Sequence, residues 1–336
     1  MDKWTNGQMD SKQAKCPFVH LTLCPYQIKD KKMKIGIIGL GSVGSAIATA
    51  VHNTGIVRQM VLFDRDELRA RAAAEDLGHA GTFNFNTEIR SGGYRELRGS
   101  DIVIIAAGAN QKPGQTRTDL LQANAAVIRD IIPQVMKNAD VAKLVLIIVT
   151  NPLDPMVMLA SELSGLPAGR VIGTGTMLDS ARLRVILARQ FGVSPASVNA
   201  FVLGEHGDSS VLNWTSASVG GLPLDDFAKQ TKNTLTAAAR KTIEHRVHNA
   251  AYEIIQGRGA TWDGIGAAAA DLVRCIANDE RRILTVSCLD RGAAVSLPRI
   301  VGIKGATAGL NPKMNASESA ALKKSIAIVK KNFSNL

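Results

Sequence analysis

Residues 35–44 read IGIIGLGSVG. The first five form a short β-branched run that is typical of a buried strand, and the glycines that follow favour a tight turn. An Ala-rich helical pattern then extends from Val43 to about Asn53. A Gly-x-Gly-x-x-Gly motif is informative only between a strand and a helix, and this one has that setting. The segment therefore predicts the first βαβ unit of a parallel sheet.

Each glycine of the motif has a separate physical use. Gly39 permits the turn, Gly41 allows close approach of a pyrophosphate, and Gly44 allows the helix to pack on the strand. Asp64 ends the next apolar run, 20 residues after Gly44, where a carboxylate accepts hydrogen bonds from ribose hydroxyls. A 2′-phosphate there would meet like charge, so NAD is favoured over NADP, although the neighbouring Arg65 leaves NADP open. The segment predicts dinucleotide binding.

Further apolar runs, separated by helical patterns, predict an α/β fold with a Rossmann-type doubly wound parallel sheet. They lie at residues 60–63, 102–106 and 144–149. After residue 175 the pattern changes and predicts helices at 178–190, 225–256 and 261–279, strands at 198–203, 283–288 and 294–301, and a terminal helix. We therefore predict a NAD-binding domain at 33–175 and an α+β substrate domain at 176–336.

Residues 1–32 have no clear periodicity and end in a charged cluster just before Met33. We interpret them as a disordered tail or a start assigned too far upstream.

Composition excludes several classes of protein. The chain has 336 residues, 46% of them hydrophobic, which excludes a disordered or fibrous protein. Forty Lys and Arg against 29 Asp and Glu give a net charge of +11 and admit anionic partners. We expect no nucleic-acid partner, because no basic cluster is interleaved with aromatics, and no membrane partner, because no apolar run approaches the length of a membrane-spanning helix.

Four scattered cysteines favour a reducing, cytoplasmic location and no metal site.

Four polar segments are candidates for chemistry: residues 111–117, 151–154, 179–182 and 204–208. The first, second and fourth follow strands, and the third opens a helix. His206 lies between glycines, and imidazole suits proton transfer because its pKa is near neutrality. Arg182 offers a fork that matches a carboxylate, but its spacing from Asp179 also permits a simple ion pair on the helix surface.

These motifs, in this order and spacing, resemble the L-lactate and malate dehydrogenases over residues 34–333. The resemblance implies that His206 donates a proton to the substrate and accepts it back, and that Asp179 orients the His206 ring. It also implies that Arg182 binds the substrate carboxylate and that Arg117, on a mobile loop, polarises the carbonyl. Asn151 would touch both nicotinamide and substrate. Thr261 would form the pocket floor, and the implied cofactor positions are Gly39, Gly41, Val43, Gly44, Asp64, Gly108, Asn124, Asn151 and Thr174.

Gln111, six positions before Arg117, discriminates between substrates. Malate enzymes of this family carry an arginine there for the second carboxylate of oxaloacetate. Burying that carboxylate against a neutral amide costs several kcal/mol, so a dicarboxylate is disfavoured. The sequence is most like the lactate dehydrogenase branch, an enzyme of glycolysis and fermentation that acts on a small 2-oxo or 2-hydroxy monocarboxylic acid. A broader L-2-hydroxy-acid dehydrogenase of the hydroxyisocaproate type stays open as an alternative.

The resemblance also implies a homo-oligomer, a tetramer or a dimer. Many bacterial relatives bind a sugar bisphosphate between subunits through an arginine and a histidine. Arg184 occupies the first position, but Asn199 stands at the second. We therefore predict no strong activation by fructose 1,6-bisphosphate.

Overall fold

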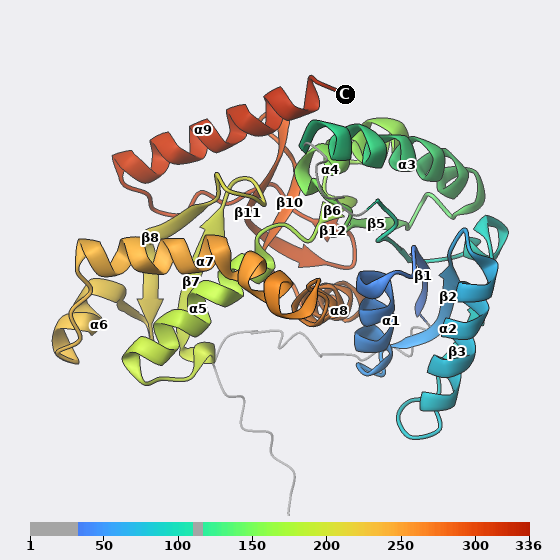
Figure 1. Cartoon of the computed structure of the whole chain (residues 1–336), viewed down its shortest axis with the longest axis horizontal. Helices are drawn as coiled ribbons and strands as arrows, with labels where there is room; N and C mark the ends of the chain where they lie inside the picture. Colours follow the sequence, from blue (N-terminus) through green and yellow to red (C-terminus); the bar gives the residue numbers. More distant parts are fainter. Residues whose placement is uncertain (1–32, 110–116) are drawn as a thin grey trace, which may run out of the picture. The chain divides into compact units, whose positions relative to one another are not determined.

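The computed structural model describes residues 33–109 and 117–336, with Arg117 described by its backbone alone. Its main sheet has nine strands in the order β12-β11-β10-β6-β5-β4-β1-β2-β3 (Figure 1). The six parallel strands are β1 (Met33–Ile38), β2 (Val57–Phe63), β3 (Glu88–Ser91), β4 (Ile102–Ile105), β5 (Val145–Ile148) and β6 (Val171–Gly173). The predicted α/β fold class is confirmed. The short strands β3 and β6 were not predicted.

Helices cover both faces of this parallel sheet. Because side chains alternate along a strand, Ile102 and Ile104 of β4 face one layer and Val103 and Ile105 face the other. The first layer contains α1 (Ser42–His52), α2 (Glu67–Ala80) and α8 (Asp263–Ala277). The second contains 3-10 helix η1 (Tyr94–Leu97), α3 (Arg117–Asn138), α4 (Leu153–Ser164) and α9 (Ala316–Phe333).

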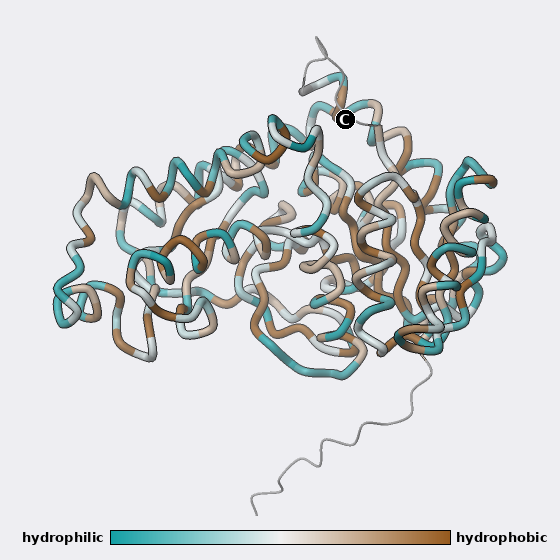
Figure 2. Tube along the Cα trace, turned by 60° about the horizontal axis from the view of Figure 1, so that its bottom comes forward, coloured by the Kyte–Doolittle hydropathy of each residue, from teal (hydrophilic) through white to brown (hydrophobic). Residues whose placement is uncertain are grey.

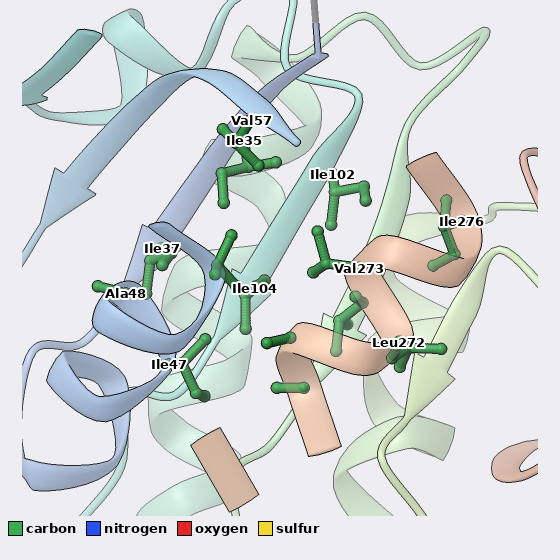
Figure 3. Close-up of a cluster of buried hydrophobic side chains, with 14 of the residues drawn as sticks. Ile35, Ile37, Ile47, Ala48, Val57, Ile102, Ile104, Leu272, Val273 and Ile276 are labelled. Carbon is green, nitrogen blue, oxygen red and sulfur yellow. The ribbon is translucent and has the colours of Figure 1, made fainter. Parts of the chain in front are cut away.

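The strands are hydrophobic along their length because both faces are buried. Figure 3 shows Ile102 and Ile104 packing with side chains of α1 and α8, and Figure 2 colours the central strands mostly as hydrophobic. This double burial fixes the strands and so fixes the loops at their ends.

The sheet continues into the second half of the chain. Strands β10 (Arg282–Asp290), β11 (Ala293–Gly302) and β12 (Gly305–Ala306) run antiparallel to their neighbours and extend the sheet beyond β6. The junction pairs Ser287 with Gly173, where a Cβ would lie 3.1 Å from the Ser287 Cβ. The predicted strand pair exists, but it belongs to the same sheet as the NAD-binding half. The boundary near residue 175 stays a prediction.

A smaller antiparallel sheet packs with the remaining helices around its own core. Its strands are β7 (Val198–Leu203), β8 (Val211–Val219) and β9 (Leu222–Pro223). The helices are α5 (Met177–Phe191), 3-10 helix η2 (Pro195–Ser197), α6 (Leu224–Gln230) and α7 (Ala237–Arg258). Strand β8 was not predicted.

The single helix predicted at 225–256 is wrong, because two helices occupy this stretch. α6 ends before Lys232, whose φ of 55° lies in the left-handed region. α7 starts anew after Thr236, whose side chain accepts a hydrogen bond from the Ala239 N–H. The predicted helix at 261–279 is shorter, from Asp263 to Ala277.

The loops after β1 and β4 meet where the strand order reverses. A Cβ on Gly39 would lie 2.4 Å from the backbone of Ala107. In open α/β sheets, ligands bind in the crevice beside such a reversal, at the carboxyl ends of the strands. The fold therefore places the crevice beside residues 39–44.

We predict that Gly44→Ala destabilises the protein by about 3 kcal/mol, because the new Cβ would lie 1.8 Å from the Gly39 carbonyl oxygen and would push α1 away from β1. Gly41→Ala is the matched control. Its Cβ would meet nothing within 4 Å, and its backbone is extended, so we expect a loss below about 1 kcal/mol. Urea unfolding of both variants measures the difference, and equal losses would contradict the packing argument.

Candidate active site

The Gly-rich loop forms a narrow cradle for an anionic ligand. Gly39 has a φ of +92°, and a side chain there or on Gly44 would collide with backbone. Gly41, in contrast, faces open space directly before α1. The first turn of a helix carries unpaired N–H groups and partial positive charge. Bare backbone at this position suits the approach of a pyrophosphate.

Asp64 is held at the end of β2 facing this loop. Its Oδ2 accepts the Leu40 N–H at 2.7 Å, and its Oδ1 accepts the Asp66 N–H at 3.0 Å. Arg69 also reaches Oδ1, at 3.5 Å. Carboxylate oxygens accept more than one hydrogen bond, so Asp64 can hold the loop and still receive hydroxyl donors. These residues fit a dinucleotide with an unmodified adenosine ribose.

Asn124 braces two loops of the crevice. Its Oδ1 accepts the Ala109 N–H at 2.6 Å, and its Nδ2 donates to the Asn151 carbonyl at 2.7 Å. A Cβ on Gly108 would lie 3.1 Å from that Oδ1 and 2.8 Å from Thr150. Asn124 thus acts on the crevice through the loops that follow β4 and β5.

Val43 and Thr174 lie at two other edges of the crevice. Val43 is in the first turn of α1 and is partly buried against the core. Thr174 is buried directly after β6. Their predicted contacts with a cofactor stay predictions.

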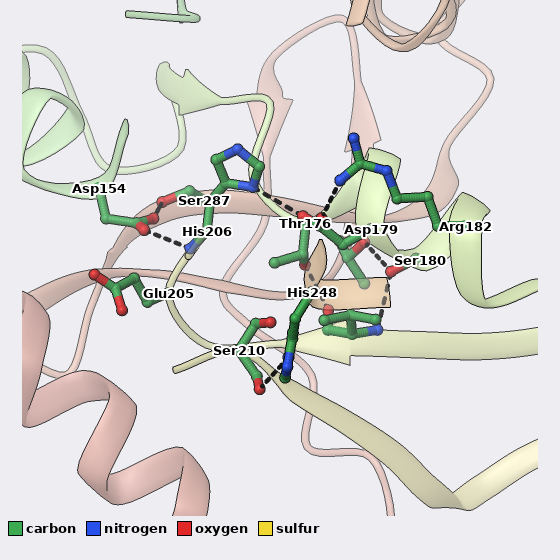
Figure 4. A network of polar contacts seen from close by, with 12 residues as sticks. Asp154, Thr176, Asp179, Ser180, Arg182, Glu205, His206, Ser210, His248 and Ser287 are labelled. Carbon is green, nitrogen blue, oxygen red and sulfur yellow. Dashed lines mark hydrogen bonds and ion pairs between the residues drawn. The ribbon is translucent and has the colours of Figure 1, made fainter. Parts of the chain in front are cut away.

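One carboxylate joins the two predicted functional cations. Asp179 Oδ2 lies 2.8 Å from His206 Nδ1, and its Oδ1 accepts from Arg182 Nη1 at 2.9 Å (Figure 4). The side chains of Asp179 and Arg182 are only 11% and 15% exposed, and that of His206 is 27% exposed. The ion pair left open by the sequence exists, but it is part of a sheltered cluster and not a solvated helix surface.

The cluster changes the acidity of its members. Burial by itself lowers the pKa of His206, but the Asp179 charge and hydrogen bond outweigh it, with help from Asp154, so the pKa is raised. Burial likewise raises the pKa of Asp179, and the His206 and Arg182 charges outweigh it, so the pKa is lowered. A raised histidine pKa stabilises the fold at low pH, and that stabilisation is lost as pH rises through the folded-state pKa.

The His206 loop is also fixed through its main chain. The His206 N–H donates to Asp154 Oδ2 at 2.7 Å, and the Glu205 N–H donates to Ser325 Oγ at 2.8 Å. Ser287 Oγ donates to Asp154 Oδ1 at 2.6 Å. Asp154 belongs to a segment singled out by its position after a strand, but no role was predicted for it. Ser287 and Ser325 carry no local sequence signal, because their partners lie 133 and 120 positions away.

A cavity of about 950 Å³ opens beside His206 and is lined by Asn151 and by residues of β8, α7 and α9. Thr261 lies between α7 and α8 and is not among the described residues that line it. Arg117 is the first residue of α3. Gln111 lies outside the described residues. The structure thus brings together His206, Asp179 and Arg182, with Asn151 in the same cavity as His206.

Comparison with known proteins assigns the family. Residues 33–173 match the family described as lactate/malate dehydrogenase, NAD binding domain, and residues 176–336 match the lactate/malate dehydrogenase alpha/beta C-terminal domain. The chain belongs to the lactate/malate dehydrogenase family.

Individual family members are similar over nearly their whole length. The L-lactate dehydrogenase of Thermus aquaticus is 48% identical over 304 residues, which cover 89% of this chain and 97% of that relative. The L-lactate dehydrogenase of Deinococcus radiodurans is 43% identical, with the same coverage. The crystal structure of the minor L-lactate dehydrogenase of Enterococcus mundtii superposes with a TM-score of 0.87 at 35% identity, covering 91% of this chain and 98% of that one.

In the part of this family member that the structure describes, the helices are too short or too polar to cross a membrane.

We predict that Asp179→Asn lowers the pKa of His206, because the substitution removes the charge that raises it. NMR titration of the His206 ring should give a value above 6.5 in the unaltered protein and a lower one in the variant. Asp101→Asn is a matched control, because Asp101 also accepts a backbone N–H, from Lys34, but lies at the amino end of β4. An unchanged His206 titration in Asp179→Asn would refute the electrostatic assignment.

Proposed function

We propose that this protein is an NAD-dependent L-lactate dehydrogenase that interconverts pyruvate and L-lactate. The observation that carries the proposal is the bridge made by Asp179 between His206 and Arg182. In this proposal, the proton donor and the carboxylate-binding group contact the two oxygens of one carboxylate. The names of the similar proteins support the same reaction.

The cofactor proposal rests on the Gly-rich loop. The loop of residues 39–44 and the start of α1 would hold the pyrophosphate of NAD, and Asp64 would accept the ribose hydroxyls. When bound, NADH supplies the hydride. The other proposed contacts are Val43, Gly108, Asn124, Asn151 and Thr174.

His206 handles the proton. With Nδ1 held by Asp179, its Nε2 is the ring nitrogen available to donate a proton to the carbonyl oxygen of a 2-oxo acid. Asp179 stabilises the imidazolium form needed for pyruvate reduction. In lactate oxidation, neutral His206 takes the hydroxyl proton back, and the same carboxylate stabilises the product imidazolium.

Arg182 orients the substrate. One guanidinium nitrogen donates to Asp179, and the remaining N–H donors of the planar fork suit a carboxylate. Asn151 would contact the substrate oxygen from the cavity it shares with His206. Arg117 would add positive charge beside the carbonyl, where negative charge develops in the transition state.

The substrate proposal is a small monocarboxylic acid. A neutral residue at Gln111 gives the second carboxylate of oxaloacetate no charged partner. Thr261 is proposed to limit the side chain that the pocket accepts. A hydroxyisocaproate-type preference is the alternative to pyruvate.

We further propose a cytoplasmic homo-oligomer, a tetramer or a dimer. The helix α7 supports association, because Tyr252, Ile254 and Ile255 are between 38% and 50% exposed on it. Arg184 on α5 is partly buried near Asp271 and Arg282, and Asn199 is exposed on β7. That a sugar bisphosphate does not strongly activate the enzyme stays a prediction.

A steady-state comparison of substrates and cofactors tests the proposal. We expect kcat/KM for pyruvate to exceed that for oxaloacetate by at least about 100-fold, because an unpaired carboxylate costs several kcal/mol. We also expect NADH to be preferred over NADPH because of the Asp64 charge. A preference for 4-methyl-2-oxopentanoate would favour the broader enzyme, and no reduction of any 2-oxo acid would refute the proposal.

His206→Asn should lower kcat for pyruvate reduction by about 10² to 10⁴-fold, the usual contribution of a positioned general acid. NADH binding, measured by fluorescence titration, should change little. His245→Asn is the matched control, because His245 is exposed on α7. Retention of activity within a factor of ten in His206→Asn would refute the catalytic assignment.

A further inference from the structure

Asp154 is a buried carboxylate in contact with the main chain of the proposed catalytic residue. It lies in the first turn of α4 and is 1% exposed. Both oxygens are occupied, Oδ2 by the His206 N–H at 2.7 Å and Oδ1 by the Ser287 hydroxyl at 2.6 Å. Burying a charge is costly unless the surroundings compensate for it, and within the described residues the two groups that donate to it, the His206 N–H and the Ser287 hydroxyl, are neutral.

The positions of the neighbouring charges identify the compensation. Figure 4 shows Asp154 and Asp179 on opposite sides of His206. Among the described residues, the charged groups with the largest effect on His206 are these two carboxylates and Arg182, while Glu205 of the same loop acts on Asp154. Burial raises the pKa of Asp154 to about 6, against the hydrogen bonds from Ser287 and His206. A pKa of about 6 leaves Asp154 mostly charged at neutral pH, and the charge of the His206 ring, when protonated, lowers that pKa.

The adjacent residue of the loop is fixed in an independent way. A Cβ on Gly204 would lie 2.5 Å from Ser325 Oγ, the atom that accepts the Glu205 N–H. Gly204 also forms a β-bridge with Ser296 of β11. The segment before His206 is thus held by β11 and α9, and the main chain of His206 itself is held by α4 through Asp154.

We infer that Asp154 is a positioning residue that fixes the main chain of His206 and supplies a second negative charge to its protonated ring. The inference rests on the proposed function. Asp179 determines which way the imidazole points, while Asp154 determines where the residue that carries it lies. Neither task can be done by the other side chain, because the two contact different atoms of His206.

Two substitutions separate the contribution of geometry from that of charge. In Asp154→Asn, the amide oxygen can accept the His206 N–H while the amide NH₂ donates to Ser287 Oγ, so the positions are kept and the charge is lost. In Asp154→Ala, both the charge and the acceptors are lost, and two buried donors are left unpaired.

We expect Asp154→Asn to retain the wild-type kcat/KM for pyruvate within about threefold well below pH 6, where Asp154 is itself mostly neutral. Above pH 6 the activity of the variant should fall at lower pH than that of the unaltered protein. We expect the descending limb of its pH profile to move by about half a pH unit or more to lower pH, because a neutral amide stabilises imidazolium less than a carboxylate does. NMR titration of His206 in the cofactor-free protein should show the same displacement.

We expect Asp154→Ala to lower kcat at least about tenfold at every pH, and KM for pyruvate by less than threefold in either direction, because Arg182 is untouched. Asp101→Asn is the control for removing a carboxylate that accepts a backbone N–H elsewhere. If Asp154→Ala does not fold, the pH profile and the His206 titration of Asp154→Asn still test the inference.

The inference is overturned if Asp154→Asn leaves both the pH profile and the His206 titration unchanged. It is also overturned if Asp154→Asn loses activity equally at all pH values. Failure of the unaltered protein to reduce pyruvate with NADH would refute the proposed function instead. In that case the His206 titration still tests whether Asp154 acts on the histidine.

Discussion

The carboxylate of Asp179 is the interaction around which the rest of the site is organised. Each of its oxygens takes one cation, His206 from the loop after β7 and Arg182 from the next turn of α5. A charge with so little exposure is stable only because both partners are in place. Asp179 thereby links the proposed proton donor, His206, to the proposed carboxylate-binding group, Arg182.

Hydrogen bonds and a β-bridge from distant elements of the fold hold the loop that carries His206. The same loop is tied to α4 by Asp154, to α9 by Ser325 and to β11 by the bridge at Gly204. Strand β10 contributes Ser287, which pairs across the sheet with Gly173. The antiparallel extension of the sheet therefore contributes to the candidate site, because Ser287 of β10 contacts Asp154 and Asp154 contacts the His206 N–H.

The charged groups of the candidate site do not share the positive excess of the whole chain. The chain carries a net charge of +11, yet the described site combines two buried carboxylates with one guanidinium and one imidazole. With the imidazole protonated, the charges of these four groups cancel, and Glu205 of the His206 loop adds one further carboxylate. The general basic surplus has no assigned partner.

The sequence by itself determined the parallel α/β fold and most of the candidate site. Period and composition identify doubly buried strands, the setting of Gly39, Gly41 and Gly44 identifies a dinucleotide loop, and residue chemistry singles out His206 and Arg182. These signals lie within short stretches of sequence, so they can be recognised without a structure.

Only the tertiary structure decided which groups meet. The break between α6 and α7 depends on a left-handed residue at Lys232 and a cap at Thr236, which a hydrophobic pattern does not record. The sheet continues through β10 by the pairing of Gly173 with Ser287. Asp154 contacts His206 and Ser287, which lie 52 and 133 positions further along the chain. Hydrogen bonds between such distant positions are fixed by packing, because no local propensity or spacing along the chain specifies them.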